Sequence, residues 1–250
     1  MNQPPAGDVA GRCRIAGSGT TRRLTLPLLA EVPGLIHAFT TRGSLVEEAI
    51  AEAAGRPLPL ASVRQTHGTE VHTVGDHDAL AAPGERPAGD ALITRRRGVG
   101  LQVSVADCVP ALLCDPVSGW IAAVHAGWRG TVAGAVTSAI RALARRGVRS
   151  DDLRMVLGPS IGLCCFEVGE EVVKAFRRAG LPGTTPGVDG RPARIDLLES
   201  NRWQALREGV LPERIAASGL CTACRPDLLE SHRRSRGRPG RMAAVIAWRG

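Results

Sequence analysis

The sequence predicts an α/β fold: a single domain with a mixed β-sheet core flanked by helices. Short apolar runs rich in β-branched residues alternate along the chain with segments of helical periodicity. Hairpin-like pairs of short runs surround Gly68 and Gly119, which favours a mixed sheet over a purely parallel one. With 250 residues, the chain can bury a sizeable core within one domain.

Domain organisation follows from the distribution of turn-forming residues. Residues 1–23 are rich in Pro, Gly and Arg and are expected to form a flexible N-terminal arm, whereas 24–250 form the single domain. The opening residues MNQPPAGDVAGR lack the apolar core of a signal peptide, and no apolar run approaches the length of a membrane span. We therefore expect a cytoplasmic protein without a membrane partner.

The formal net charge of +8 attracts anionic ligands, but its distribution argues against a nucleic acid partner. The positive charge is almost entirely arginine, with Lys174 as the only lysine, and the arginines are spread along the chain. The chain has no tyrosine, three Phe and four Trp, too few aromatic side chains for stacking single-stranded bases. We expect small phosphorylated or anionic partners and no specific nucleic acid.

Periodicity and turn residues assign the elements in chain order. Ser44 and Glu47 have the spacing of a capping box and Gly55 can end the helix that they begin. Glu170 begins a second helix whose charges match the helix dipole. Strands are expected within 35–42, 60–68, 70–75, 90–94, 99–105, 109–114, 120–125, 153–158 and 194–197, and helices within 44–55, 131–146, 170–180 and 198–209.

The stretch ADCVPALLCDPVSGWIAAVHAGWRG, residues 106–130, carries the chemistry that most needs explaining. Cys108 follows the apolar run 99–105, and His125 ends the run WIAAVH. Both residues therefore fall where strands give way to loops. Side chains anchored on rigid strands but directed into loops are well placed to build a binding site.

A thiolate and an imidazole are ligand types that zinc accepts readily, and a third ligand is needed. The best candidate is His67 in VRQTHG, where Gly68 relieves crowding beside it. Three protein ligands would leave one position for water or substrate, the pattern of a catalytic zinc site. On spacing alone, Cys108 could instead be a small buried apolar side chain, which is the usual role of a lone buried cysteine. A carboxylate near a ligand histidine would orient its ring, and Asp90 and Asp107 both compete for that role.

The other cysteines give weaker indications. Seven cysteines with irregular spacing suit reduced thiols better than a disulfide framework. Cys164 and Cys165 are adjacent and are expected to point in different directions, so that they would not serve one metal. Cys221 and Cys224 form the only CxxC motif. Without a second pair we expect two packed thiols, with a redox pair or half a zinc site as the alternatives.

Several motifs resemble a known family. RQTHG, GDALIT, VADCVP, HAGWRG, LGPSIG and the late GR-M-AAVIAW together resemble the YfiH-type family, also called laccase-domain or polyphenol-oxidase-like proteins and similar to purine nucleoside phosphorylases. The resemblance extends from about Leu35 to the C-terminus. It implies a zinc-containing enzyme that cleaves adenosine, inosine and methylthioadenosine with phosphate to ribose 1-phosphate, or its methylthio analogue, and free base. It also implies an adenosine deaminase side activity.

The resemblance further implies which residues act. The family's metal-binding and catalytic His, Cys and His carry over to His67, Cys108 and His125. The substrate-binding arginines that it implies are Arg42, Arg233 and Arg241. Arg129 is a further candidate for binding phosphate, because it lies beside the helix start near Gly130. Arg42 precedes a helix start, where its planar fork and free backbone N–H groups suit an oxyanion. Two departures affect these positions: TTRGS lacks the family's second glycine after Arg42, and ESHRR has His232 where the family has tyrosine.

Two other functions remain open. One is a copper-dependent polyphenol oxidase of laccase type, since two histidines and a cysteine suit copper as well as zinc. The chain has too few histidines in HxH pairs for a multicopper centre, however. The other is a factor that edits cell-wall precursors, with a structural metal. Whether the protein is a monomer or a homodimer is also left open.

Overall fold

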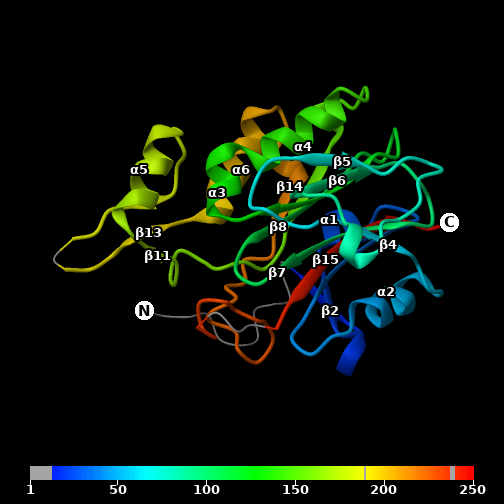
Figure 1. Ribbon diagram of the computed structural model, residues 1–250, viewed down its shortest axis with the longest axis horizontal. Helices are drawn as coiled ribbons and strands as arrows, with labels where there is room; N and C mark the ends of the chain where they lie inside the picture. Colours follow the sequence, from blue (N-terminus) through cyan, green and yellow to red (C-terminus); the bar gives the residue numbers. More distant parts are fainter. Residues whose placement is uncertain (1–12, 189, 237–239) are drawn as a thin grey trace.

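The strands form two six-stranded sheets that pack face to face, with helices on their outer faces (Figure 1). The computed structural model describes residues 13–188, 190–236 and 240–250. Both sheets contain parallel and antiparallel neighbours, which confirms the predicted α/β class with a mixed β core flanked by helices.

The first sheet has the strand order β1-β2-β3-β15-β7-β4. Its pairs are antiparallel except for β4 and β7. β15 lies between β3 and β7, so segments from opposite ends of the chain share the middle of the sheet (Figure 1). The bounds are β1 (Arg14–Ala16), β2 (Arg23–Thr25), β3 (Leu35–Thr40), β15 (Met242–Trp248), β7 (Gly100–Val105) and β4 (Leu60–Ser62).

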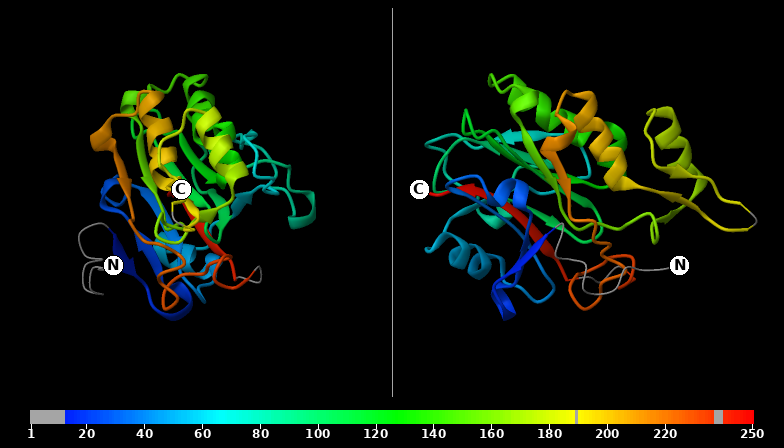
Figure 2. Two further views of the ribbon diagram at one scale, coloured as in Figure 1. Left: turned by 90° about the vertical axis from the view of Figure 1, so that its left-hand side faces the viewer. Right: turned by 180° about the vertical axis from the view of Figure 1, so that it is seen from behind.

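The second sheet has the order β14-β10-β8-β9-β6-β5, with parallel pairs only at its two edges. Its strands are β14 (Ile215–Ala217), β10 (Arg154–Leu157), β8 (Val109–Cys114), β9 (Ile121–Ala126), β6 (Ala91–Thr94) and β5 (Val71–Thr73). A small antiparallel sheet of β11 (Glu167–Val168), β13 (Ala193–Ile195) and β12 (Thr184–Thr185) projects with α5 (Glu170–Arg178) from one end (Figures 1 and 2).

The remaining helices cover the sheets. α2 (Val46–Ala54) packs on the outer face of the first sheet through an apolar cluster. The outer face of the second sheet is covered by α3 (Trp128–Ala133), α4 (Ala135–Ala144) and α6 (Leu197–Arg207). The short α1 (Pro27–Ala30) contacts β3 and β10. Single 3₁₀ turns occur at η2 (Gly19–Thr21), η3 (Pro83–Glu85), η4 (Ser150–Asp152) and η5 (Pro212–Arg214). Among the described residues, no helix has the length and apolar character that a membrane span requires.

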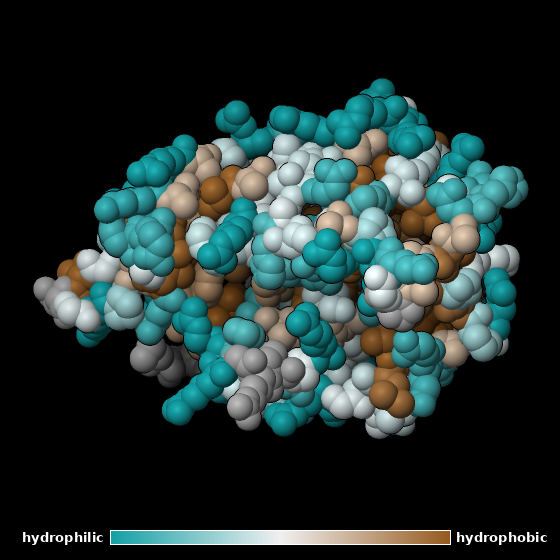
Figure 3. All heavy atoms as spheres, in the orientation of Figure 1, coloured by the Kyte–Doolittle hydropathy of each residue, from teal (hydrophilic) through white to brown (hydrophobic). Residues whose placement is uncertain are grey.

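Strand alternation builds the layers. In β9, Ile121 and Ala123 pack into the core between the two sheets, whereas Ala122 and Val124 pack against the helices. β15 alternates in the same way, with Ala244 facing the core between the sheets. Because successive side chains point to opposite faces of a strand, a strand that is buried on both faces has apolar residues at every position. Hydrophilic side chains are spread over the outer surface viewed in Figure 3.

Three local expectations need correction. Residues 13–23 are not part of a flexible arm: β1 pairs with β2 at the edge of the first sheet and Cys13 is buried, while residues 1–12 lie outside the described residues. The helix expected over 131–146 is two helices, because Gly134 adopts φ +90° between them. Ser44 does not cap α2, because its hydroxyl donates to the Arg22 carbonyl oxygen instead.

A buried histidine in β3 makes stability depend on pH. The Nε2 atom of His37 accepts a hydrogen bond from the Leu26 backbone N–H at 2.9 Å, and burial lowers the pKa of His37 from 6.5 to about 4. Below pH 6.5 the unfolded chain therefore takes up a proton that the folded chain refuses. We expect the free energy of unfolding to fall between pH 6.5 and 4, by up to about 3 kcal/mol.

Urea unfolding at pH 7.5, 6 and 5 measures this effect. His37→Gln keeps an acceptor but cannot take up the proton, so its stability should fall less across this range than that of the unsubstituted chain. Equal pH dependence in both proteins would show that His37 does not carry the effect.

Candidate metal centre

Strand pairing in the second sheet brings Cys108 and His125 together. Val109, the first residue of β8, pairs with Ala126, the last residue of β9. Cys108 directly precedes β8 and His125 is the penultimate residue of β9, so the antiparallel register places both at one end of the sheet. The apolar strands that the sequence predicted on either side therefore determine this part of the site.

His67 reaches the same place on the crossover from β4 in the first sheet to β5 in the second. The side chain of Gln65 anchors this crossover to β7: its amide donates to the Ser104 carbonyl oxygen and its oxygen accepts from the Ser104 N–H, both at 2.8 Å. Sequence reasoning missed Gln65, because nothing in the local pattern shows that its partner lies on β7.

The three predicted ligand residues form one cluster. Their ligand atoms all lie within 4.8 Å of one another. The Cys108 Sγ is 4.0 Å from the His67 Nε2, and the two imidazole rings stand 4.9 Å apart at 78°. His125 is buried, Cys108 is half-buried and His67 is exposed, so the cluster is anchored in the core and open on the side of His67.

Asp90, immediately before β6, organises the cluster. Its Oδ1 lies 2.8 Å from the His125 Nδ1 and accepts from the His67 N–H at 3.0 Å. Its Oδ2 accepts from the N–H groups of Thr66 and Gly68 and from the Thr66 hydroxyl. Because a carboxylate accepts at Nδ1, His125 carries a proton there, and Nε2 is the nitrogen left to bind a ligand once it has lost its own proton. Asp90 therefore takes the orienting role for which two aspartates competed.

These hydrogen bonds also fix an unusual backbone. His67 has φ +61°, a conformation that residues other than glycine seldom adopt, and the bonds of Asp90 to the neighbouring N–H groups hold it there. Burial by itself would raise the pKa of Asp90, but the bonds from His125, Gly68 and Thr66 lower it well below its ordinary value. The carboxylate is thus ionised throughout the neutral pH range.

Asp107 has a different task. It has φ +91°, and its carboxylate accepts hydrogen bonds from the Thr222 hydroxyl and from the Arg233 backbone N–H at 2.7 Å. These bonds stabilise the turn from β7 in the first sheet to β8 in the second, in which Cys108 is the next residue. Thr222 and Arg233 therefore hold the residue directly before Cys108, through contacts that no local pattern predicted.

Cys108 and His125 shift each other's pKa values. Burial opposes ionisation of Cys108, yet hydrogen bonds with His125 and His67 lower its pKa from 9.0 to about 7. Burial likewise opposes protonation of His125, while Asp90 and Cys108 raise its pKa to about 9. The cluster therefore makes the thiolate, which is the form of cysteine that binds metals, more accessible at neutral pH than in an ordinary cysteine.

The donor set fits a metal ion with an open coordination position. Two imidazole nitrogens and one thiolate are the ligands that zinc or copper accepts, and three of them leave a fourth position free. The space between them is kept by Gly127, the residue before α3. A Cβ atom there would come within 2.8 Å of the His67 Cδ2 and 2.9 Å of the Cys108 Sγ.

Gly127→Ala should therefore lower metal affinity by about tenfold or more, as expected when ligands are displaced from their geometry. Gly127 has φ −75°, so alanine is allowed by the backbone and the effect is confined to crowding at the ligands. Gly84→Ala is the matched control, because a Cβ atom there would meet nothing within 4 Å. Isothermal titration with Zn²⁺ measures both variants, and equal affinities would contradict the proposed ligand geometry.

Two of the predicted substrate-binding arginines are connected to segments that carry cluster residues: Arg129 follows shortly after His125 in the chain, and Arg233 bonds to the residue before Cys108. Arg129 is exposed in the first turn of α3 and packs on the Trp128 ring at 4.3 Å. Arg233 is joined to Cys108 through its backbone bond to Asp107, and its guanidinium lies 5.4 Å from the Phe166 ring.

The other two arginines lie on neighbouring segments. Arg42 is exposed, donates to the Pro226 carbonyl oxygen at 3.1 Å and lies 3.3 Å from a Glu230 oxygen. Arg241 is exposed directly before β15. Within the described residues, the hydrogen bonds and ion pairs of Arg42 lead to residues 226–230, not to the cluster. An oxyanion that binds Arg42 would thus compete with the Glu230 carboxylate for its guanidinium group.

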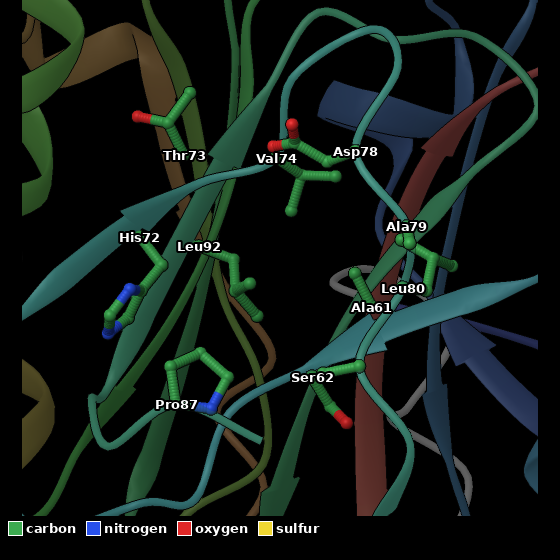
Figure 4. Close-up of a pocket in the computed structure, with 11 residues that line it drawn as sticks. Ala61, Ser62, His72, Thr73, Val74, Asp78, Ala79, Leu80, Pro87 and Leu92 are labelled. Atoms are coloured by element: carbon green, nitrogen blue, oxygen red, sulfur yellow. The ribbon is translucent and has the colours of Figure 1, made fainter. Parts of the chain in front are cut away.

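A separate pocket of about 340 Å³ lies between β4 and β5 (Figure 4). Leu92, Val74, Leu80 and Pro87 give it a mainly apolar lining. His72 borders the pocket, and its Nε2 lies 2.7 Å from the Ala88 carbonyl oxygen, so its ring is held by a hydrogen bond. The residues that line the pocket do not include those of the metal cluster.

Comparison with known proteins identifies the family. Residues 45–249 match the family model described as "Multi-copper polyphenol oxidoreductase laccase". The chain belongs to this family. The resemblance to YfiH-type, laccase-domain proteins is thereby confirmed.

Relatives within the laccase family are named as enzymes. The purine nucleoside phosphorylase of Bacteroides thetaiotaomicron is 40% identical over 73% of this chain and 70% of its own length. The purine nucleoside phosphorylase of Deinococcus radiodurans is 35% identical over 88% and 92%. A protein named adenosine deaminase RL5, from an unknown prokaryotic organism, is 37% identical over 68% of each chain.

Solved structures of the family share the fold. The YfiH protein of Bacillus licheniformis superposes with a TM-score of 0.83 at 28% identity, over 94% of this chain and 99% of its own. YlmD of Geobacillus stearothermophilus superposes with a TM-score of 0.81 at 29% identity, over 95% and 99%.

Proposed function

We propose that this chain is a zinc-dependent purine nucleoside phosphorylase with an adenosine deaminase side activity. Its substrates are phosphate with adenosine, inosine or methylthioadenosine. The observation that carries the proposal is the convergence of His67, Cys108 and His125, open on one side, in a chain whose relatives bear both enzyme names. All seven cysteines are free thiols, which suits a cytoplasmic enzyme.

Zinc would be held by His67, Cys108 and His125. When bound, it would supply a Lewis acid that lowers the pKa of water toward neutrality. Asp90 keeps the His125 ring in the tautomer that offers Nε2, and it is saturated by its own hydrogen bonds. We therefore assign Asp90 a positioning role and not that of a proton-transfer group.

Phosphorolysis breaks the bond between ribose C1′ and the purine nitrogen and forms a bond from C1′ to a phosphate oxygen, while the base takes up a proton. The reaction needs cations to hold the phosphate. Arg129 and Arg233 are best suited, because each is exposed and connected to a segment that carries a ligand. Arg42 and Arg241 extend the positive charge along the neighbouring surface. Deamination replaces the amino group of adenosine with oxygen from water and releases ammonia.

The number and placement of the histidines favour the proposed nucleoside chemistry over oxidation by a multicopper centre. The chain has six histidines. Only His67 and His125 belong to a metal-capable group among the described residues, and the second such group consists of cysteines. The Nε2 atom of His37 already accepts a hydrogen bond from the Leu26 N–H. A multicopper centre built from several histidines thus lacks ligands, although a single copper ion remains compatible with the cluster.

The deciding experiment is a substrate assay on purified protein loaded separately with Zn²⁺ and Cu²⁺. We expect the zinc form to release free base and ribose 1-phosphate from adenosine and inosine only when phosphate is present. Adenosine alone should give inosine and ammonia. Catechol oxidation by the copper form, without phosphorolysis by the zinc form, would replace this proposal with the polyphenol oxidase alternative.

A further inference from the structure

A second cluster of metal-ligand side chains lies outside the centre described above. Cys164, Cys165, Cys221 and Cys224 bring their sulfur atoms within 4.8 Å of one another. We propose that these four cysteines form a structural tetrathiolate zinc site. This proposal does not rest on the proposed enzymatic function, because none of the four cysteines belongs to the first cluster.

The sulfur separations support four ligands around one ion. The Cys224 Sγ lies 3.6 Å from the Cys164 Sγ and 3.4 Å from the Cys165 Sγ. A zinc–sulfur distance of 2.3 Å in a tetrahedron requires sulfurs about 3.8 Å apart. A disulfide would require a sulfur–sulfur bond of about 2.05 Å and would use the cysteines only in pairs.

The expectation that adjacent cysteines would point apart is wrong, because they lie in a turn and not in a strand. The Cys165 and Phe166 N–H groups both donate to the Gly162 carbonyl oxygen, at 2.9 and 3.0 Å. This turn directs Cys164 and Cys165 toward the same partner sulfur. Gly162 also leaves room, since a Cβ atom there would lie 3.3 Å from the Cys164 Sγ.

Backbone pairing supplies the other two sulfurs. Ser160 forms a parallel bridge with Cys221, and the Thr222 N–H donates to the Ser160 carbonyl oxygen at 3.0 Å. The Gly162 N–H donates to the Cys221 Sγ at 3.2 Å, the type of N–H contact that stabilises a thiolate ligand. The CxxC turn after this bridge then brings Cys224 back to the cluster.

Nearby guanidinium groups reduce the net negative charge that four thiolates would create around a divalent ion. Arg234 donates to the carbonyl oxygens of Thr222 and Ala223, between the two cysteines of the CxxC motif. Arg233 lies 3.4 Å from the Cys165 carbonyl oxygen. Cys164 is exposed, which gives an ion a path into the otherwise half-buried cluster.

The position in the fold indicates what the ion would stabilise. The cluster joins the loop after β10 to the segment 220–225, and Thr222 in that segment donates to the Asp107 carboxylate beside Cys108. An ion bound by the four cysteines would therefore fix the segment that supports the turn before β8. Closed sites with four thiolates contribute to folding and leave no position for substrate.

The test measures zinc per chain, by mass spectrometry of the metal, in variants purified under reducing conditions. Cys164→Ser and Cys224→Ser should each lose one zinc ion per chain relative to the unsubstituted protein, and should melt at a lower temperature. Cys114→Ala is the control for loss of a cysteine elsewhere, because Cys114 is buried away from both clusters, and its zinc content should be unchanged.

Substitutions in the two clusters separate this proposal from the enzymatic one. Cys108→Ala should retain the tetrathiolate ion and, loaded with Co²⁺, show intense sulfur-to-metal charge-transfer absorption that disappears when Cys224→Ser is added. Unchanged metal content in Cys164→Ser and Cys224→Ser would overturn the site, even if Cys108→Ala loses its own metal. Non-reducing mass analysis that finds a disulfide among the four cysteines in the purified protein would overturn it as well, and covers the case in which a variant fails to fold.

Discussion

Replacing Cys108 by alanine, or His67 by asparagine, is expected to abolish phosphorolysis and deamination together and to remove one metal ion per chain. Losing a group that only orients a ligand already costs about 10- to 100-fold in metal affinity, so losing a ligand should cost at least about a hundredfold in turnover. Asparagine is the better replacement at His67, because it tolerates the φ of +61° there and removes only the imidazole.

Matched substitutions show whether the effect belongs to the site. His77→Asn makes the same change at an exposed histidine, and Cys114→Ala removes a thiol from the core. Both variants should keep turnover and the first metal ion. Phosphorolysis that continues unchanged in Cys108→Ala and His67→Asn would refute the assignment of the centre, whatever the metal content of the protein.

The sequence contained enough information for the strands but not for their distribution between sheets. β7 and β8 were both predicted from their apolar runs, yet they belong to different sheets, although only residues 106–108 separate them. What redirects the chain is the positive φ of Asp107, held by Thr222 and Arg233. Those partners lie more than a hundred residues away, as the separations of 115 and 126 show, and a local pattern cannot reveal them.

The convergence of His67, Cys108 and His125 could be predicted because an imidazole and a thiol were expected where strands end. Spacing alone left Cys108 open to a purely structural role, and the family resemblance pointed to the same three residues. The surroundings were not predictable, because charge alone does not identify a partner. Arg42 resembled an oxyanion ligand in the sequence, but in the fold it lies 3.3 Å from Glu230. The directions of Cys164 and Cys165 were predicted wrongly, because both meet Cys224 through a turn and a bridge that the sequence does not specify.

Asp90→Asn should weaken both the metal centre and the fold. An asparagine keeps one acceptor oxygen, but its NH₂ group would face N–H groups that now donate to one of the Asp90 carboxylate oxygens. His125 would also lose the negative charge that orients its ring. We expect metal affinity to fall by about 10- to 100-fold. Because a buried charge-assisted network is broken, the free energy of unfolding should fall on the order of 3 kcal/mol.

The pH dependence of that loss follows from the pKa of Asp90. The folded-state pKa lies well below 3.8, so the carboxylate contributes its full stability above the unfolded value. The difference in unfolding free energy between the two proteins should thus stay constant from pH 8 to about 5 and shrink progressively as the pH falls from there toward the folded pKa. Urea unfolding across this range measures it.

Asp115→Asn distinguishes loss of stability from loss of the centre. Asp115 is also buried and accepts from the Val117 and Ser118 N–H groups, but it follows β8 at the opposite end from Cys108. This substitution should destabilise the fold while leaving zinc affinity at the first cluster unchanged. If both asparagine variants bound zinc as tightly as the unsubstituted protein, Asp90 would be a structural residue only. Weak binding in Asp90→Asn alone would show that its carboxylate determines how His67 and His125 are presented to the ion.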